Sequence, residues 1–412
     1  MIHTKKTTCR ICARNRLQRF LSLGHTPLAN SFLHSKEEFG DEKSYPIDVY
    51  YCEDCHLVQL LDVIDPEYLF RDYIYLTGTS ETIAAHNVSY AKTLVDLLKL
   101  EKNDLVVEIA SNDGSLLKCF QQYNVRTLGV EPAMNIAQIA NERGIETIVR
   151  FFNSDEADDI REIYGKAKVV IGNNVLGHVD EARDFLMGFT NLVAEDGFVV
   201  IEVPYLRDLI QRLEYDTIYH EHLSYFSVTS LLRLFESVGL KIIRVDHIPV
   251  HGGSIRIYAG LSAAYGDHGS KVLEISNEET SIGLNSIIRY DKFARDVEDN
   301  RFGLKQLLES LTSSGKTIAG YGAPAKGNTL LNYCEINNQL ITFTVDMNPM
   351  KIGLFTPGMH IPVLPVSALL EQQLDYVMIL AWNFAEEVMR QQKEHHARGG
   401  RFIIPIPEPR VI

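Results

Sequence analysis

The sequence of 412 residues has few of the features that tie a protein to nucleic acid or to a membrane. It contains no long run of Lys and Arg, and its formal net charge is −14. A surface that follows a phosphate backbone needs a basic stripe, so we expect no nucleic-acid partner. No uninterrupted apolar stretch reaches membrane-spanning length, and the opening residues Met1 to Lys6 lack the apolar core of a signal peptide. We therefore expect no association with a membrane.

Cysteine is scarce as well, with six residues in the whole chain. Cys119 and Cys334 stand alone, which argues against a disulfide framework and favours a cytoplasmic protein. The other four form two Cys-x-x-Cys pairs, and two such pairs complete the tetrahedron of a structural zinc site. Two unrelated reduced thiol pairs, as in redox motifs, are the alternative. The predicted zinc ligands are Cys9, Cys12, Cys52 and Cys55.

The spacing of apolar runs predicts an α/β protein after this first module. From about residue 84, short apolar runs alternate with helical segments, as in a mostly parallel sheet covered on both faces. Two runs joined by a Gly-containing loop, 240–245 and 254–259, predict a closing antiparallel pair, which suits a methyltransferase sheet better than a fully parallel one. The main strands are expected at Leu105–Ile109, Thr127–Glu131, Lys168–Gly172 and Gly197–Val203.

A second α/β unit follows the first. A long charged stretch from about Glu278 to Ser313 is expected to be helical, and further strands are expected near 317–322, 341–345, 376–380 and 401–405. We therefore predict three domains. They are a zinc-binding module over 1–70, a class I methyltransferase domain of Rossmann-like fold over 71–262, and a C-terminal Rossmann-like α/β domain over 263–412.

The loop after the first strand of the middle domain carries a cofactor signature. It reads Glu108-Ile-Ala110-Ser-Asn112-Asp-Gly114 and fits E-x-[GA]-x-[GN]-x-G, the loop of S-adenosylmethionine enzymes, rather than the dinucleotide pattern G-x-G-x-x-G. Glu131 ends the next strand, where a carboxylate accepts hydrogen bonds from ribose hydroxyls. A turn with only a structural role is the alternative. We expect these five residues to hold the cofactor.

Polar residues also follow the later strands of this predicted sheet. Ligands of open α/β sheets bind beyond the carboxyl ends of the strands. The loop from Asn173 to His178 therefore offers Asn174 to the cofactor and His178 to a substrate. A helix-capping Asn followed by a partly exposed His accounts for the same residues equally well.

The strongest catalytic candidate is the segment Tyr219-His-Glu221-His222-Leu-Ser-Tyr-Phe. It lacks the H-E-x-x-H spacing of a zinc protease, and a polar helix start is the plainer alternative. Histidine is suited to proton abstraction near neutral pH, a neighbouring Glu orients the imidazole, and Tyr donates to a developing enolate oxygen. We expect this cluster to carry the chemistry.

Three further segments are candidates for substrate contacts. An aromatic connector supplies phenol donors, or packs the zinc module onto the middle domain. A Gly-Gly loop lets backbone approach a ligand and offers an arginine to phosphate, or is a plain hairpin turn. A Gly-rich strand-to-helix turn favours an anion, or needs its glycines only to form the turn. It lacks the Walker spacing, so we do not expect ATP hydrolysis. In chain order these candidates are Tyr73, Tyr75, His251, Gly253, Ser254, Arg256, Lys326 and Asn328.

In order and spacing, these motifs resemble the nucleotide-sugar C-methyltransferase family of branched deoxysugar pathways. The segments that carry the resemblance are C-x2-C…C-x2-C, E-I-A-S-N-D-G, G-V-E-P, I-Y-H-E-H-L-S-Y-F, H-G-G-S-I-R and G-Y-G-A-P-A-K-G. The resemblance covers nearly the whole chain. It implies a zinc module, a central S-adenosylmethionine domain and a C-terminal Rossmann-like domain, with the active site between the last two.

The resemblance also implies a reaction and a substrate class. Members methylate C3 of a dTDP-linked 4-keto-deoxysugar through an enolate. The expected partner is therefore a dTDP-linked or other NDP-linked keto-deoxysugar, and the protein is expected to be a monomer. On the shared Y-x-E-H stretch, His222 is implied as the base that removes the C3 proton, with Tyr219 and Glu221 positioning the base and the sugar. His178 and Tyr73 are implied as further polar groups. A sugar O-methyltransferase and a non-catalytic protein that binds a nucleotide sugar or a partner remain open.

Overall fold

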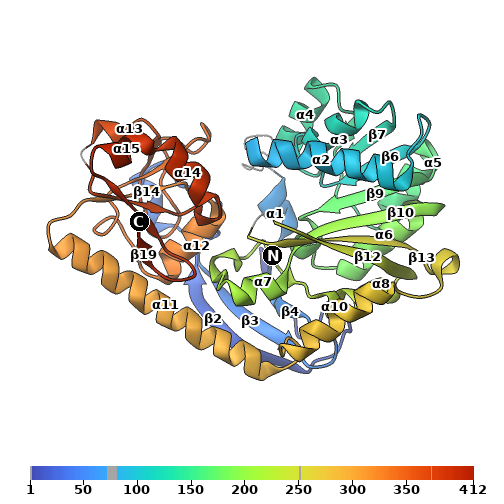
Figure 1. Ribbon diagram of the computed structural model, residues 1–412, viewed down its shortest axis with the longest axis horizontal. Helices are drawn as coiled ribbons and strands as arrows, with labels where there is room; N and C mark the ends of the chain where they lie inside the picture. The colour runs from blue at the N-terminus through green and yellow to red at the C-terminus, as the bar shows by residue number, and fades with distance from the viewer. Residues whose placement is uncertain (1, 72–80, 250–251, 373) are drawn as a thin grey trace.

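The computed structural model describes residues 2–71, 81–249, 252–372 and 374–412. Figure 1 shows two lobes, each built on its own sheet, with the N-terminal strands lying below and between them. The lobe on the right holds the middle part of the chain, and the lobe on the left holds the C-terminal part.

A four-stranded antiparallel sheet in spatial order consists of β11 (Ser224–Tyr225), β4 (Val58–Leu60), β3 (Tyr45–Cys52) and β2 (Leu17–Thr26). Nearby, β1 (His3–Lys5) pairs with β5 (Asp62–Ile64). Within β3, the buried residues Ile47, Val49 and Tyr51 alternate along the strand, as the two-residue period of a strand requires. Because β11 comes from the middle of the chain, it ties this sheet to the middle domain.

The large sheet has the arrangement that the apolar runs predict. All of its strands are parallel except β13, which pairs antiparallel with both of its neighbours. The closing antiparallel pair and the class I methyltransferase topology are thereby confirmed. In spatial order the strands are β12 (Leu240–Ile248), β13 (Ser254–Leu261), β10 (Val193–Pro204), β9 (Ala167–Asn173), β6 (Leu105–Ile109), β7 (Arg126–Val130) and β8 (Thr147–Ile148).

Helices cover both faces of this sheet. Successive strand residues point to opposite faces, so Val106 packs with one helical layer while Leu105 and Val107 pack with the other. The layer around Val106 is formed by α2 (Glu81–Leu98), α3 (Ser115–Gln121) and α4 (Met134–Glu142). The opposite layer is formed by α5 (Ser154–Tyr164), α6 (Ala182–Leu192) and α8 (Val228–Glu236).

The C-terminal lobe is a second Rossmann-like unit with a six-stranded sheet. Its strands are parallel except for the last, which turns back along its neighbour. The spatial order is β16 (Val363–Pro365), β15 (Thr344–Asp346), β14 (Ile318–Tyr321), β17 (Tyr376–Ile379), β18 (Arg401–Ile404) and β19 (Arg410–Val411). Its helices are α12 (Ala325–Tyr333), α13 (Ala368–Glu371), α14 (Ala385–Gln391) and α15 (Lys393–Ala397).

The stretch from 278 to 313 is largely helical, as expected, but a turn divides it. The two helices are α10 (Ser270–Ser281) and α11 (Ile287–Ser313). Gly283 lies in this turn with a φ of +83°, a left-handed conformation that ends a helix. The buried face of α11 packs in one cluster with residues of β2, β3 and β14, so this helix joins the N-terminal sheet to the C-terminal lobe along the lower edge of Figure 1.

Short segments complete the described chain. They are α1 (Pro66–Phe70), α7 (Leu206–Gln211), α9 (Ser262–Tyr265) and the 3-10 turns η1 (Lys36–Gly40), η3 (Leu176–His178), η4 (Tyr215–Thr217) and η5 (Trp382–Phe384). Among the described residues, no helix combines the length and the apolar character that crossing a membrane requires.

Candidate functional site

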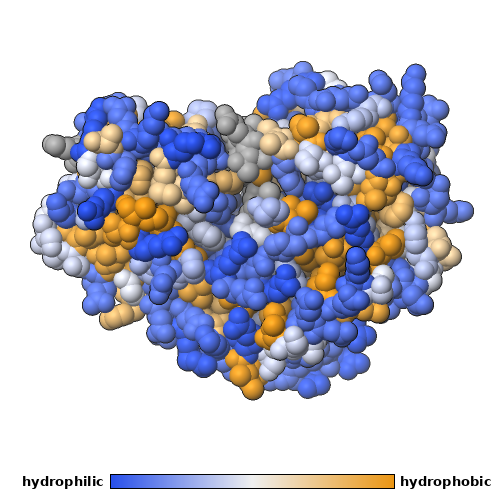
Figure 2. Space-filling model, in the orientation of Figure 1, coloured by the Kyte–Doolittle hydropathy of each residue, from blue (hydrophilic) through white to orange (hydrophobic). Residues whose placement is uncertain are grey.

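A cavity of about 940 Å³ has walls drawn from both lobes and from the N-terminal module. Its wall includes the carboxyl ends of β6, β7, β9 and β10 and the loop after β14. Ligands of open α/β sheets bind at this edge. Figure 2 shows the notch between the two lobes. The predicted site residues in the cavity wall are Glu108, Ala110, Asn112, Glu131, Asn174, His178, Tyr219, His222 and Lys326.

The loop after β6 has the tight backbone that the cofactor signature predicts. Ala110, Asn112 and Gly114 all have positive φ angles, of 55°, 50° and 73°. The Glu131 carboxylate at the end of β7 holds the loop, because Oε2 accepts from the Asn112 amide at 2.9 Å and Oε1 accepts from the Ala133 amide at 2.9 Å. Gly114 lies behind the wall, where a Cβ would come within 2.9 Å of Ile145.

Polar atoms at the carboxyl ends of β6 and β9 fit a cationic, hydroxyl-rich cofactor. Glu108 Oε2 and Asn174 Oδ1 are buried and have no hydrogen-bond partner among the described residues. Burial raises the pKa of Glu108 well above its usual range. Burial also raises the pKa of Glu131, against the lowering effect of its two amide donors. S-adenosylmethionine, with its positive charges and ribose hydroxyls, offers partners for these atoms.

The proposed catalytic cluster follows η4 and faces the same cavity. The Thr217 carbonyl accepts a hydrogen bond from His222 Nδ1 at 2.7 Å. Since a carbonyl only accepts, the proton lies on Nδ1 and the lone pair of the neutral ring lies on Nε2. The ring centroids of Tyr219 and His178 lie 4.0 Å and 4.8 Å from that of His222. Burial lowers the pKa of His178 to about 4, so His178 is neutral at pH 7.

Hydrogen bonds hold this cluster between η3 and the N-terminal sheet. The Leu223 amide donates to the Gly177 carbonyl at 2.7 Å, and the Leu223 carbonyl accepts from the Leu60 amide at 2.9 Å. His220, the other histidine of the segment, donates from Nε2 to the Tyr45 carbonyl at 3.1 Å. Burial lowers the pKa of His220 to about 4.

Glu221 is buried behind the cavity wall, where residues of other domains contact it. Asn30, a wall residue from the N-terminal module, donates from Nδ2 to Glu221 Oε1 at 2.7 Å. Sequence reasoning missed Asn30, because a single Asn in an irregular loop matches no motif. It also missed Lys351, a buried cation in the same wall.

The candidate substrate residues occupy three different environments. Lys326 lies in the cavity wall, with its Nζ 5.6 Å from the centroid of the Trp382 ring. Asn328 lies behind the wall and donates from Nδ2 to the Ala29 carbonyl at 2.7 Å. Ser254 begins β13 and Gly253 directly precedes it, both outside the wall, and a Cβ on Gly253 would collide with Asp208. Tyr73, Tyr75 and His251 lie outside the described residues.

Arg256 lies within β13, in the strand that the apolar run over 254–259 predicts. It pairs with Glu202 across the β10–β13 ladder, at 2.8 Å between Nη2 and Oε2. Its guanidinium carbon lies 3.4 Å from the centroid of the Tyr90 ring, and His86 contacts both Arg256 and Glu202. Burial opposes ionisation of Glu202, but its contacts with His86 and Arg256 lower its pKa overall. Arg256 therefore acts on the cavity through Glu202, which is part of its wall.

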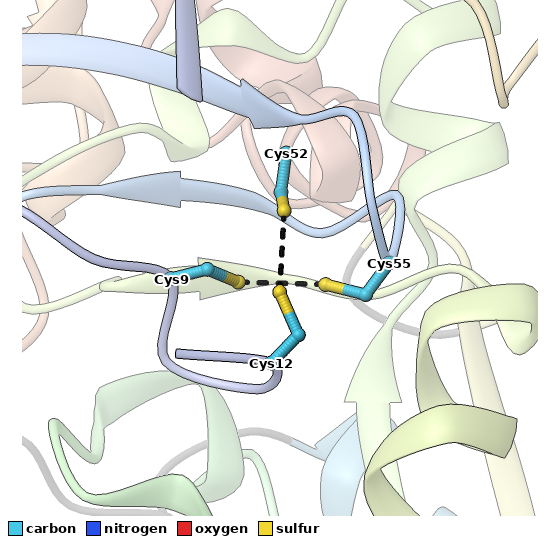
Figure 3. A group of neighbouring side chains, drawn as sticks. All are labelled: Cys9, Cys12, Cys52 and Cys55. Atoms are coloured by element: carbon cyan, nitrogen blue, oxygen red, sulfur yellow. Dashed lines mark hydrogen bonds between the residues drawn. The ribbon is translucent and has the colours of Figure 1, made fainter. Parts of the chain in front are cut away.

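The four paired cysteines converge, as Figure 3 shows. Their sulfur atoms all lie within 4.8 Å of one another, with 3.4 Å between Cys9 and Cys55 and 3.5 Å between Cys12 and Cys52. Four thiolates around zinc, with bonds of about 2.3 Å, stand about 3.8 Å apart. The site therefore fits a tetrahedral zinc ion, and all four ligand positions come from protein. No other group of this kind occurs among the residues described.

Three family models match the chain in sequence. Residues 9–70 match a zinc binding domain, 84–245 match a methyltransferase domain, and 249–407 match the C-methyltransferase C-terminal domain. The chain is 40% identical to the C-methyltransferase NovU of Streptomyces niveus over 404 residues, which cover 98% of this chain and 96% of that protein.

Solved methyltransferase structures are similar to part of the chain. Magnesium protoporphyrin IX methyltransferase from Synechocystis PCC 6803, with bound SAH, is 16% identical over 43% of this chain and 82% of its own, with a TM-score of 0.35. An S-adenosylmethionine-dependent methyltransferase from Clostridium acetobutylicum is 11% identical over 43% of this chain and 92% of its own, also with a TM-score of 0.35.

Proposed function

This chain belongs to the S-adenosylmethionine-dependent C-methyltransferases, and from that premise we propose that it methylates C3 of a nucleotide-linked 4-keto-deoxysugar, with His222 as the base. The observation that carries the proposal is that one cavity contains both the cofactor loop and His222. The reaction needs a base and a methyl donor that both reach the same carbon. The resemblance in sequence motifs supplies the sugar as the substrate class.

The geometry of His222 suits proton abstraction next to a ketone. Its Nδ1 proton is held by the Thr217 carbonyl, which leaves Nε2 as the basic atom. A C3 proton becomes acidic when the charge on the neighbouring C4 oxygen is stabilised. In the proposed reaction, Nε2 removes the C3 proton and the electron pair of the C–H bond enters the enolate. When bound, S-adenosylmethionine supplies the electrophilic methyl group.

The neighbours of His222 have supporting roles in this proposal. Tyr219 lies against the His222 ring and offers a phenol to the sugar. His178 is neutral at pH 7, so it acts as a hydrogen-bonding group and adds no charge repulsion when His222 becomes protonated. Glu221, held by Asn30, provides a nearby carboxylate that favours the protonated imidazole. Tyr73 is proposed as a further donor on the basis of the family resemblance.

The remaining polar residues are assigned to the two ligands. Glu108, Ala110, Asn112, Glu131 and Asn174 are proposed to hold S-adenosylmethionine, with Gly114 setting the turn. Lys326, at the N-terminus of α12, is proposed to contact the nucleotide diphosphate. The other proposed contributors to the sugar-nucleotide site are Tyr75, His251, Gly253, Ser254, Arg256 and Asn328. Since these groups all belong to one chain, we propose that a monomer is active.

Membership of the C-methyltransferase family argues against both alternatives. An O-methyltransferase would use the same cofactor loop but place the methyl on a hydroxyl. A non-catalytic binding protein has no use for an imidazole with a fixed tautomer inside the cofactor cavity. The difference is measurable, because only carbon methylation requires exchange of a proton on carbon.

The test is incubation with a dTDP-4-keto-6-deoxyhexose in deuterated water, followed by mass spectrometry and NMR. The proposal expects exchange of the C3 proton without cofactor, and a new methyl on C3 when S-adenosylmethionine is present. A methyl on oxygen without C3 exchange would overturn it. His222→Asn should reduce the exchange rate at least 100-fold. His220→Asn is the matched control, because that ring is engaged with the Tyr45 carbonyl, and it should retain exchange.

A further inference from the structure

Lys351 is a buried lysine in the wall of the same cavity. Its side chain is 9% exposed, and it follows β15 in the C-terminal lobe. A lysine is almost never buried to this degree unless it is paired. The contacts of its ammonium group therefore indicate what else it binds.

The ammonium group has few partners among the described residues. Nζ donates to the Ala323 carbonyl at 2.8 Å, and its one ion pair is with Asp346 Oδ2 at 4.0 Å. The Phe32 ring centroid lies 5.2 Å away. Since an ammonium has three donors, the Ala323 carbonyl accounts for only one of them.

The Asp346 carboxylate accepts hydrogen bonds from backbone amides and does not form a short ion pair with Lys351. Its Oδ2 accepts from the Ala323 amide at 2.7 Å, and its Oδ1 accepts from the Asn348 amide at 2.8 Å. Burial lowers the pKa of Lys351, while the charges of Asp346 and Glu221 oppose that shift. The buried cation thus sits at the cavity with attraction from two carboxylates but with close contact to neither.

We propose that the Lys351 ammonium binds an anionic oxygen of the substrate in this cavity. The inference rests on the proposed function, which supplies two sources of such an oxygen. One is the diphosphate of the nucleotide sugar. The other is the C4 oxygen of the enolate: His222 Nε2 takes the C3 proton, the C–H electron pair forms the C3–C4 double bond, and the carbonyl π pair moves to the C4 oxygen, which becomes negative.

The enolate source is favoured because Lys351 lines the same cavity as His222. Glu221 is close enough to influence the charge of Lys351, and it directly precedes His222 in the chain. A positive group fixed near the developing oxyanion needs no reorganisation during the reaction, which is the main source of electrostatic catalysis. A purely structural lysine that holds the loop after β14 would give the same contact with Ala323 but no effect on substrate.

The test uses Lys351→Gln, which keeps an N–H donor for the Ala323 carbonyl and removes the charge. Lys316→Gln is the matched control, because Lys316 is a half-exposed lysine paired with Asp375 at 2.9 Å. Four quantities are measured on wild type and both variants: the Kd of dTDP, the rate of C3 proton exchange, the Kd of S-adenosylmethionine, and Tm. Lys351→Met is the second variant if Lys351→Gln does not fold.

A Kd for dTDP weakened about tenfold or more supports the inference and identifies the diphosphate as the source. An unchanged dTDP Kd with an exchange rate reduced about 100-fold supports it and identifies the enolate oxygen. If both quantities stay within twofold of wild type while wild type exchanges, the inference is overturned, whether or not Tm falls. If wild type shows neither exchange nor turnover, the proposed function fails instead.

Discussion

The carboxyl edges of the two Rossmann-like sheets share a backbone arrangement but differ in charge. In the middle domain, Glu131 ends the second strand and accepts from the Asn112 and Ala133 amides. In the C-terminal lobe, Asp346 ends the second strand and accepts from the Ala323 and Asn348 amides. In each case one oxygen binds the loop after the first strand and the other binds the amide two residues on.

The charged groups beside these two loops have opposite signs. The first edge buries the Glu108 carboxylate, and the second buries the Lys351 ammonium. A buried, incompletely paired carboxylate favours a cation, and a buried, incompletely paired ammonium favours an anion. The two edges therefore differ in the charge of the ligand they favour: the first suits the positively charged methyl donor, and the second suits the proposed, negatively charged sugar nucleotide.

The largest effect is expected from loss of the zinc site, because the N-terminal module supports both sheet edges. Cys52→Ser should remove zinc and unfold the N-terminal sheet, because a structural zinc contributes about 10–16 kcal/mol of binding free energy. Both ligand affinities and all activity should then be lost. Metal analysis, circular dichroism and turnover check this, with Cys119→Ser, outside the four-cysteine cluster, as the control. A zinc-free protein with full activity would contradict the structural role of the metal.

Removing the negative charge from the edge of the middle-domain sheet should weaken the binding of one ligand and leave the binding of the other unchanged. Glu108→Gln should weaken S-adenosylmethionine binding about 10- to 100-fold, because a hydrogen bond to a charged group contributes about 1.5–3 kcal/mol. The Kd of dTDP should stay within twofold. Calorimetric titration with each ligand measures both, and Glu195→Gln, whose side chain is 91% exposed, is the control. Equal losses of affinity for both ligands would contradict the assignment of one sheet edge to each ligand.

The affinity for the cofactor should depend on pH through the ionisation of the Glu108 carboxylate. Because burial raises the Glu108 pKa, this group becomes protonated at a higher pH than an exposed glutamate. Affinity for S-adenosylmethionine should fall as pH is lowered through that raised pKa, and binding in this range should release a proton. In the unliganded protein the same shift lowers stability as pH rises between the unfolded and folded pKa values. Calorimetry in two buffers of different ionisation enthalpy detects the proton, and Glu108→Gln should abolish its release.

The two loop anchors form a matched pair with smaller effects. Glu131→Gln should weaken S-adenosylmethionine binding about 3- to 10-fold, and Asp346→Asn should weaken dTDP binding by a similar factor, because each loses charge-assisted contacts with two amides. Each variant serves as the control for the other. If either substitution affects both ligands alike, the two loops are not independent binding elements.

The smallest effect is expected from the contact that the N-terminal module makes with the catalytic segment. Asn30→Ala removes one hydrogen bond to Glu221, which contributes about 1 kcal/mol and corresponds to about fivefold in kcat. KM for the sugar nucleotide should change less than kcat. Steady-state kinetics measures both, and an unchanged kcat would confine the module to a structural role.

The parts of the site that sequence reasoning found are local. The loop from Glu108 to Gly114 needs only its own positive φ angles and one acid at the end of the next strand. Parallel strands bring their carboxyl ends to one edge, so the pattern of strands and loops is enough to bring Glu131 to this loop. The two cysteine pairs are equally readable, because metal geometry demands a fixed spacing within each pair.

What the sequence left open involves contacts across the chain. Arg256 falls in the strand expected over 254–259, but only the register of β10 and β13 sets it opposite Glu202. The helical stretch expected over 278–313 divides into α10 and α11, with Gly283 in the turn between them. Side-chain pattern alone does not specify strand register or the packing of one helix against two domains.

By itself, the sequence determined the α/β class, the methyltransferase sheet, the cysteine cluster and the cofactor loop, because short-range spacing encodes each of them. Only the tertiary structure decided which charges meet at the cavity. Asn30 contacts Glu221 across 191 positions of sequence, and Lys351 arrives from a third part of the chain. Contacts between segments so far apart depend on the folded arrangement of the domains. No local pattern in the sequence predicts that arrangement.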